Sequence, residues 1–88
     1  MIRRRVIVHG LVQGVFFRDT IRRRAVGVNV SGWVRNNPDG TVEAVFEGGS
    51  SEVERLVSFC RGGPRGARVD DAVVTVEDPE ALHGFEIG

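Results

Sequence analysis

The sequence lacks several features that would tie it to a special environment or to a highly charged partner. Its 88 residues include one cysteine and no tyrosine, and its 12 basic residues, none of them lysine, balance 12 acidic residues. One cysteine cannot form an internal disulfide. Zero net charge argues against nucleic-acid and membrane-surface binding, because such proteins usually carry a basic excess. We therefore expect neither nucleic acid nor membrane as a partner.

Long apolar runs are also missing. No stretch approaches the ~20 apolar residues that cross a bilayer, and the first ten residues, MIRRRVIVHG, lack the apolar core of a signal peptide. Together with the lone Cys60, this indicates a cytoplasmic location. A chain of this length that is 41% hydrophobic fits one compact domain, residues 1–88, which we expect to be a monomer.

Two patterns open the chain. Residues 3–12 alternate apolar with polar or small side chains, which predicts a strand with one buried face. Residues 13–29 predict a helix, because their apolar side chains recur at spacings of four, four and three. The residues on this face are Phe17, Ile21, Ala25 and Val28. Asn29 suits the left-handed conformation that often ends a helix.

A hairpin and a second helix are predicted next. Residues 30–37 and 41–48 are rich in strand formers and flank NPDG, in which Pro38 presets φ and Gly40 supplies the positive φ of a turn. Ser51 and Glu54 form a capping box. The helix that follows, with Val53, Leu56, Val57 and Cys60 on one face, runs to the break at residues 62–64. Residues 67–77 predict a further strand, and residues 84–87 a short last strand whose neighbour the pattern does not identify.

This order of elements predicts an α+β fold. Strand, helix, strand, strand, helix, strand packs as one antiparallel sheet with both helices on one face, the ferredoxin-like βαββαβ sandwich, here with a short final strand. A strand-helix-strand crossover makes its two strands parallel, so their C-terminal ends share one edge of the sheet. We therefore expect Gln13 to Arg18 and Asn36 to be neighbours.

Two interpretations of that edge are open from spacing alone. Gly14 in a loop before a helix leaves free N–H groups and the positive end of the helix dipole, which favour an anion, and Arg18 can add a bidentate contact. The other interpretation is a tight turn with Phe16 and Phe17 in the core and Arg18 in solvent. Asn36 is likewise either a turn residue or an amide that holds a water molecule.

Other candidates have structural explanations. Cys60 falls on the apolar face of the second helix, which indicates a buried, inert thiol. His9 and His83 lack metal-ligand spacing, so we predict no metal site. Trp33 indicates packing on the sheet, and the arginine runs at 3–5 and 22–24 are typical of solvated stretches. An RNA-binding sheet would display aromatic residues on its central strands, where only Phe46 is available.

Two stretches of the sequence are similar to the signatures of a known family. VHGLVQGVFFR, residues 8–18, and GWVRNNPDGTVEAVFEG, residues 32–48, resemble the first and second signatures of the acylphosphatases. The resemblance extends over nearly the whole chain and implies a ferredoxin-like fold. It also implies a hydrolase that cleaves the carboxyl-phosphate bond of a small acyl phosphate without a cofactor or metal.

The resemblance also implies the roles of site residues. Arg18 is implied as the catalytic anion binder and Asn36 as the residue that orients the attacking water. Backbone amides would form the phosphate cradle, contributed by Gln13, Gly14, Val15, Phe16, Phe17 and Arg18. The chemistry fits, because a carboxylate leaving group, whose acid has a pKa of about 4, needs no general acid. Water would attack phosphorus in line, with no phosphoenzyme.

Two alternatives belong to other classes of protein. One is a non-catalytic acylphosphatase-like module that binds carbamoyl phosphate or a similar ligand, as in larger maturation proteins. Such modules are attached to long partners, whereas this chain begins at a methionine and ends soon after its last predicted strand. The other is an RNA-binding ferredoxin-like domain, which zero net charge disfavours.

Overall fold

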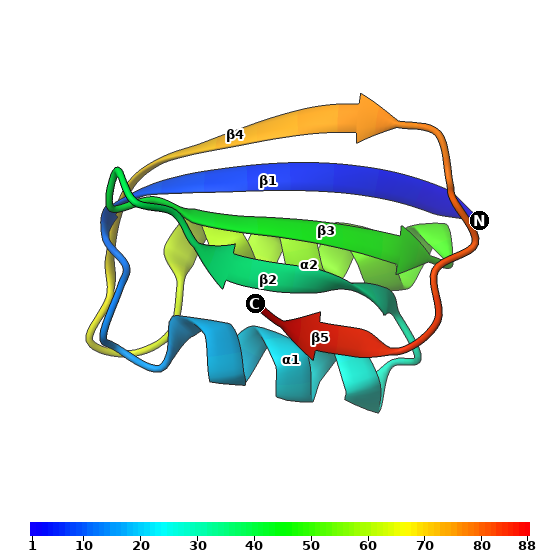
Figure 1. The fold of residues 1–88 in the computed structure, drawn as a ribbon, viewed down its shortest axis with the longest axis horizontal. Coiled ribbons are helices and arrows are strands. Elements are labelled where there is room, and N and C mark those ends of the chain that lie inside the picture. The colour runs from blue at the N-terminus through cyan, green and yellow to red at the C-terminus, as the bar shows by residue number, and fades with distance from the viewer.

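The structure, a computed structural model, describes residues 1–88 as one sheet with two helices on one of its faces (Figure 1). The element order confirms the predicted βαββαβ pattern with a short final strand. In chain order the elements are β1 (Ile2–Leu11), α1 (Phe17–Gly27), β2 (Ser31–Asn36), β3 (Val42–Gly48), α2 (Ser50–Gly62), β4 (Arg68–Glu77) and β5 (Phe85–Ile87). None of the helices is long and apolar enough to cross a membrane.

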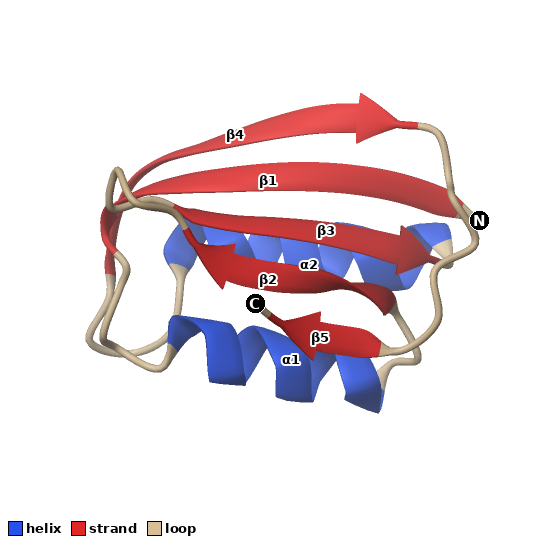
Figure 2. Ribbon diagram, viewed as in Figure 1, coloured by secondary structure: helices blue, strands red, loops and turns tan.

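The sheet has the strand order β4-β1-β3-β2-β5. Neighbours among the first four strands are antiparallel, whereas β5 pairs with β2 in parallel, with Gly32 opposite Phe85. The sequence pattern did not identify the neighbour of the last strand, and its parallel pairing makes the sheet mixed. After β4 the chain passes along one end of the sheet and enters the opposite edge from that end, so β5 runs in the direction of β2 (Figure 2).

The core lies between the sheet and the helices. Alternate residues of the strands and one face of each helix form a cluster of 16 buried hydrophobic residues, including Val6, Val34 and Phe46. Each fully buried Val, Leu, Ile or Phe side chain of this cluster contributes about 1.5–3 kcal/mol when it leaves water. The predicted helix faces are confirmed except at Val28, which is 36% exposed. Helix α1 ends one residue before Val28, and Asn29, with φ of 60°, turns the chain away.

The start of α2 differs from the prediction. The N-cap residue is Gly49, and no side chain caps the helix, so the capping box of Ser51 and Glu54 is wrong. Ser51 already lies within the first turn of α2, where its own φ and ψ are helical and it cannot act as the cap. The Val53 N–H donates instead to the Gly49 carbonyl, at 3.0 Å. The predicted end is confirmed, since α2 stops at Gly62.

The face of the sheet that lacks helices carries a network of ion pairs. Arg3, only 4% exposed, donates to Glu47 at 2.7 Å and to Glu77 at 2.8 Å, and Glu47 is 1% exposed. Arg5 pairs with Glu43 and Glu77 on the same face. The prediction that residues 3–5 are solvated is therefore wrong, because Arg3 and Arg5 have carboxylates opposite them. Residues 22–24 are exposed, as predicted.

Trp33 lies on this same uncovered face and is half-buried. The guanidinium groups of Arg5 and Arg35 lie 5.4 Å and 5.0 Å from its ring centroid. These distances are within the range of cation–π attraction. The prediction that Trp33 packs on the sheet is confirmed, with two arginines as its packing partners.

Candidate functional site

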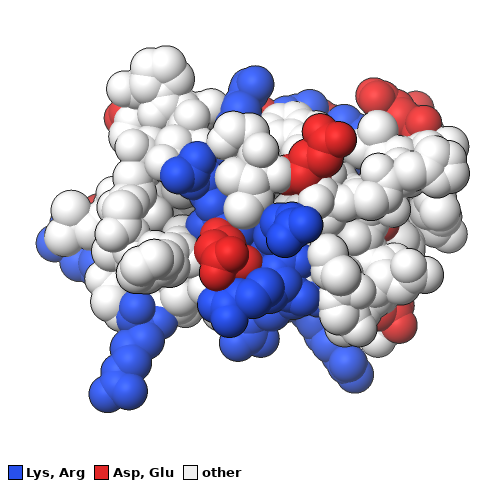
Figure 3. Space-filling view, turned by 60° about the horizontal axis from the view of Figure 1, so that its bottom comes forward, with Lys and Arg blue, Asp and Glu red and all other residues white.

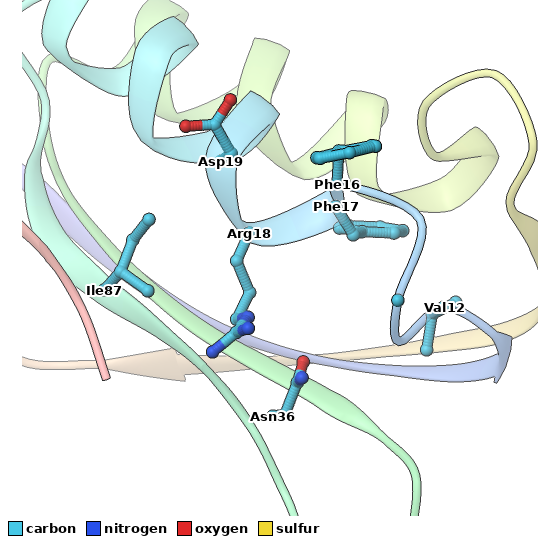
Figure 4. Close-up of a pocket in the computed structure, with 8 residues that line it drawn as sticks. Val12, Phe16, Phe17, Arg18, Asp19, Asn36 and Ile87 are labelled. Carbon is cyan, nitrogen blue, oxygen red and sulfur yellow. The ribbon is translucent and has the colours of Figure 1, made fainter.

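A pocket opens at the edge of the sheet where β1 and β2 end, beside the start of α1 (Figure 4). Its volume is about 250 Å³, and it is lined by Val12, Gly14, Phe16, Phe17, Arg18, Asp19, Asn36 and Ile87. The crossover argument is thus confirmed: the loop after β1 and the last residue of β2 meet at one edge.

The loop between β1 and α1 has an unusual backbone. Gly14 has φ of 75°, and Phe16, the residue before the helix, has φ of 58° although it is not glycine. A left-handed conformation costs a residue with a side chain roughly 1–2 kcal/mol. The Phe16 side chain is also 80% exposed, so burial does not explain its conformation. Strain of this kind is characteristic of functional loops.

This loop and the first turn of α1 present free backbone donors. Among the backbone hydrogen bonds outside regular helices and strands, none has a donor in residues 12–19. The first N–H that bonds back to the loop is that of Thr20, which donates to the Phe16 carbonyl at 3.0 Å. The N–H groups before Thr20, together with the positive end of the helix dipole, favour an anion.

Arg18 extends from the first turn of α1 towards β2. The buried Phe17 beside it, 2% exposed, anchors the start of the helix by packing against Phe59, with ring centroids 6.3 Å apart. Arg18 Nη1 donates to the Gly88 carbonyl at 3.0 Å. A guanidinium has five N–H donors in a planar fork, so the remaining donors of Arg18 can bind an oxyanion in the pocket.

Asn36 faces Arg18 from the other side of the pocket. It is the last residue of β2 and lies on the same face of the sheet as the buried Val34. Its Oδ1 atom is buried and has no hydrogen-bond partner in the protein. Figure 4 shows the Arg18 guanidinium and the Asn36 amide pointing toward each other. A buried acceptor without a partner costs about 1–3 kcal/mol, so this arrangement indicates a role beyond stability.

The predicted site residues are therefore mostly in one place. Gly14, Phe16, Phe17, Arg18 and Asn36 line the pocket. The side chains of Gln13 and Val15 do not: Gln13 donates to the carbonyls of the hairpin turn, and Val15 packs against the core.

Sequence reasoning missed three lining residues, namely Val12, Asp19 and Ile87. Val12 and Asp19 directly flank residues 13–18, so a slightly longer predicted loop would have included them. Ile87 had no sequence signal, because the pattern did not identify the neighbour of the last strand.

Asp19 is the only carboxylate that lines the pocket, and it forms an ion pair with Arg23 rather than with Arg18. Its Oδ2 atom lies 3.0 Å from Arg23 Nε, one turn further along α1. In Figure 4 its carboxylate points away from the Arg18 guanidinium. Asp19 is therefore placed at the helix start, where a negative charge interacts favourably with the helix dipole, rather than facing the Arg18–Asn36 pair.

Charge is distributed unevenly around the site. Residues 22–24 of α1 and Arg55 and Arg61 of α2 are exposed arginines. Figure 3, which looks at the lower side of the molecule in Figure 1, shows basic side chains gathered around a single acidic group near the centre of this view. A basic surface of this kind raises the local concentration of small anions, although the net charge of the chain is zero.

The other candidates lie outside the pocket. Cys60 is buried on α2, and burial raises the pKa of its thiol to about 12, which keeps it protonated and unreactive. His9 and His83 are exposed. No three His, Cys, Asp or Glu side chains are grouped as a metal ion would require. The chemistry of the pocket therefore depends on a guanidinium, an amide and backbone N–H groups.

This arrangement can bind a tetrahedral oxyanion next to a water molecule. The guanidinium and the free N–H groups belong to the same loop and first helical turn, where they can together stabilise negative charge on several oxygens. The Asn36 amide lies opposite and can hold a water molecule against the bound anion. No side chain in the pocket is placed to protonate a strongly basic leaving group, so a substrate must have a leaving group that departs as an anion.

The chain is similar to acylphosphatases in sequence and in structure. The family model for acylphosphatase matches residues 4–87. An acylphosphatase of Haloarcula marismortui is 53% identical over 85 residues, which cover 97% of this chain and 93% of that protein. The crystal structure of acylphosphatase from Bacillus subtilis superimposes with a TM-score of 0.94 and 36% identity, and covers 100% of this chain and 99% of its own.

A longer protein contains a similar unit. The crystal structure of HypF from T. kodakarensis aligns with a TM-score of 0.84 and 29% identity over 100% of this chain, but over 12% of its own. The same fold thus occurs both as a short chain and as a small part of a long one.

Proposed function

Because this chain belongs to the acylphosphatase family, we propose that Arg18 and Asn36 are the residues with which it hydrolyses the carboxyl-phosphate bond. The chain is an acylphosphatase, and its substrate is an acyl phosphate. One observation supports the assignment of the site: Arg18 and Asn36, from separate elements, face each other across a pocket beside a loop with free N–H groups, and the Asn36 oxygen has no partner in the protein.

Arg18 and the loop bind the phosphoryl group. The backbone N–H groups of residues 13–18 surround its oxygens, and the Arg18 guanidinium adds a charge-assisted, bidentate contact. In phosphoryl transfer, charge is spread over the three equatorial oxygens, so this cradle stabilises the transition state as well as the bound substrate. The Nη1 contact of Arg18 with Gly88 orients the guanidinium toward the pocket.

Asn36 holds the attacking water. Its buried Oδ1 accepts a hydrogen bond from the water, which places the water oxygen in line with the bond that breaks. Holding water and phosphorus at a fixed distance makes the attack effectively unimolecular. As the water oxygen bonds to phosphorus, its proton passes to a phosphoryl oxygen. The products are then a carboxylate and dihydrogen phosphate, with atoms and charge in balance.

The leaving group requires no acid from the protein. The bond between phosphorus and the acyl oxygen breaks with both electrons on the carboxylate, whose conjugate acid has a pKa of about 4. A phosphate monoester would instead expel an alkoxide or phenoxide. The proposed site lacks the proton donor for that, and this sets its selectivity for acyl phosphates.

The mechanism contains no phosphoenzyme. Asp19, the only carboxylate in the lining, is paired with Arg23 and turned away from Arg18. A protein quenched in acid during turnover of a substrate labelled at phosphorus should carry no covalent label. Covalent label on Asp19 would overturn direct attack by water.

The proposal is tested with two substrates under identical conditions. The protein should release phosphate from an aromatic acyl phosphate and not measurably from the matching aryl phosphate monoester. Inorganic phosphate should inhibit competitively, because it fills the same cradle. Similar rates on both substrates would contradict the leaving-group argument, and non-competitive inhibition would place the phosphate site elsewhere.

We further propose that residues 1–88 form one monomeric domain in the cytoplasm. One buried cluster takes side chains from both helices and from β1, β2, β3 and β5, and β4 packs against it, which supports a single domain. The charged groups on the uncovered sheet face pair within the chain, which supports a monomer. The free thiol of Cys60 is compatible with a reducing compartment. Light scattering that gives the mass of a dimer would contradict this proposal.

A further inference from the structure

The Gln13 side chain joins the loop between β1 and α1, residues 12–16, here called the phosphate loop, to the hairpin that follows Asn36. Its Nε2 atom donates to the carbonyl oxygen of Asn37 at 2.8 Å and to that of Thr41 at 3.0 Å. These two carbonyls belong to the first and last residues of the turn between β2 and β3. Gln13 therefore contacts the residue directly after Asn36 from a segment more than 20 positions away in sequence.

The hairpin turn is a rigid partner for this contact. The Asn37 N–H donates to the Thr41 carbonyl at 2.8 Å, and the Gly40 N–H donates to the Asn37 carbonyl at 3.1 Å. The Thr41 hydroxyl donates to Asp39 at 2.7 Å, and Asn37 Nδ2 donates to Glu43 at 3.1 Å. With four such bonds among residues 37–43, the turn holds its shape without help from Gln13.

The phosphate loop, in contrast, is held by apolar packing at Val12 and Val15 and has few hydrogen bonds of its own. No backbone hydrogen bond outside the regular elements has a donor in residues 12–16. Gln13 is the only residue of this loop with a polar side chain, since the others are Val12, Gly14, Val15 and Phe16. The two hydrogen bonds of Gln13 are therefore the polar connection between the loop and the hairpin.

The Gln13 amide is also unsuited to binding phosphate. Both hydrogens of its NH₂ group are directed at carbonyl oxygens, which leaves no donor for a substrate. The remaining amide atom, Oε1, is an acceptor and would repel a phosphate oxygen. Its side chain must therefore act on the protein and not on the substrate.

We propose that Gln13 is a positioning residue that sets the distance between the phosphate cradle and the water held by Asn36. This inference rests on the function proposed above. In-line attack requires the water oxygen and phosphorus to be placed to a fraction of an ångström, and a misplacement of ~1 Å costs about 10²-fold in rate. The phosphate cradle and Asn36, which holds the water, come from separate segments of the chain. Gln13 links these two segments next to the site.

The first test removes the two hydrogen bonds and keeps the shape of the side chain. Gln13→Met should lower turnover about 10-fold while the inhibition constant of inorganic phosphate changes less than about 2-fold, because the cradle persists and only its distance from the water varies. Gln13 is exposed, so the variant should melt like the parent. A phosphate affinity that falls together with turnover would overturn the proposal.

The decisive test repeats the substitution in a protein that lacks the Asn36 amide. If Gln13 acts through Asn36, then Gln13→Met combined with Asn36→Ala should be no slower than Asn36→Ala alone, within about 2-fold. If the turnover losses of the two single variants multiply in the double variant, the proposal is overturned, because Gln13 would then act independently of the water. If Asn36→Ala alone retained normal turnover, the proposed function itself would fail, which is a distinguishable result.

A matched control and a second variant complete the experiment. Thr20 Oγ1 donates to the Phe16 carbonyl at 2.8 Å, a side-chain bond at the other end of the same loop that does not reach the hairpin. Thr20→Val should leave turnover within about 2-fold of the parent. Gln13→Glu should be at least as slow as Gln13→Met near neutral pH, since a carboxylate opposite two carbonyls repels them. An active Gln13→Glu would overturn the proposal.

Discussion

Arginine serves two different purposes on the two sides of this sheet. On the uncovered face, Arg3 is buried, and its donors reach Glu47 and Glu77. At the edge of the helix-covered face, Arg18 makes one hydrogen bond, to Gly88, and its other donors are directed toward a pocket. The first arrangement is satisfied within the protein, whereas the second leaves donors free, which the proposed function assigns to a bound phosphate.

The carboxylates and amides follow the same division. Burial raises the pKa of Glu47, but the hydrogen bonds from Arg3 and from the N–H groups of Glu80 and Leu82 outweigh this and lower the pKa below its usual value. The Asn36 oxygen, in contrast, is buried without a partner. Buried polar groups whose hydrogen bonds are all made within the protein stabilise the fold, and polar groups at a pocket that lack a partner are available to a substrate.

Loss of Arg18 should have the largest effect on activity and little effect on stability. Arg18→Gln removes the only side-chain charge that points at the bound phosphate, so turnover should fall at least ~10²-fold and phosphate affinity should fall with it. The free energy of unfolding should change by less than ~1 kcal/mol, since one hydrogen bond is lost. Arg22→Gln, on the same helix and exposed, is the control and should retain normal turnover. Steady-state kinetics and urea unfolding measure both quantities.

Loss of Asn36 should separate binding from turnover. Asn36→Ala should lower turnover by about 10²-fold, because the water is no longer aimed, while phosphate inhibition stays close to that of the parent. Stability should be unchanged or higher by up to ~1 kcal/mol, since an unsatisfied buried oxygen is removed. Near-normal turnover in this variant would mean that Asn36 is only a turn residue.

Loss of Glu47 should have the opposite effect, a large loss of stability with little change in turnover. Glu47→Gln leaves Arg3 buried without its nearest carboxylate, and breaking a buried pair costs roughly 3–5 kcal/mol. Turnover of the folded protein should remain within a few-fold of normal. Glu54→Gln is the matched control, since Glu54 is exposed and lies 3.8 Å from Arg4, and its loss should cost less than ~1 kcal/mol. Equal effects of the two substitutions in chemical denaturation would contradict the contrast between the faces.

Acid should weaken the ion-pair network on the uncovered face. Arg5 and Arg3 lower the pKa of Glu77 to about 2, from a usual value near 4.5. A carboxylate whose pKa is lower in the folded state than in the unfolded state stabilises the fold at pH values above its unfolded-state pKa. This stabilisation is lost as the pH falls from the unfolded-state pKa to the folded-state pKa. The free energy of unfolding should therefore decrease between pH 4.5 and pH 2. Urea unfolding at several pH values measures this, and Glu77→Gln should flatten the curve. A curve that keeps its slope in this variant would assign the loss to other carboxylates.

Loss of Cys60 should have the smallest effect. Cys60→Ala leaves a small cavity under α2, so the free energy of unfolding should fall by about 1 kcal/mol. Turnover should not change, because the protonated thiol is buried away from the pocket. A loss of turnover in a variant that melts normally would make the thiol a catalytic group.

Much of the site could be predicted from local sequence. Gly14 before a helix indicates an anion loop, and the crossover rule places that loop beside Asn36. Spacing could not decide whether Arg18 faces solvent or a pocket, because a helix position fixes a direction and not what lies opposite. The family resemblance supplied the function, and the arrangement of Arg18 and Asn36 supports the roles that it implied.

The errors share a physical cause. The prediction of a capping box at Ser51 and Glu54 failed because the helix begins at Ser50, with Gly49 as its N-cap. The position of a cap depends on where the chain leaves the preceding strand. The solvated reading of residues 3–5 failed because Glu47 and Glu77 lie opposite Arg3 in the sheet register, far away in sequence. A local pattern contains no information on the residue that will face it from another strand.

The sequence by itself determined the order of helices and strands, the buried faces of β1 and of the two helices except at Val28, the turn at Pro38 to Gly40 and the edge where the phosphate loop meets Asn36. These follow from periodicity, turn chemistry and the handedness of crossovers, which are local or nearly local properties of the chain. Only the tertiary structure decided the pairing of β5 with β2, the burial of Arg3 and the reach of Gln13 to the hairpin. Each of these joins segments distant in sequence, and each depends on strand register and side-chain geometry, which exist only once the sheet has formed.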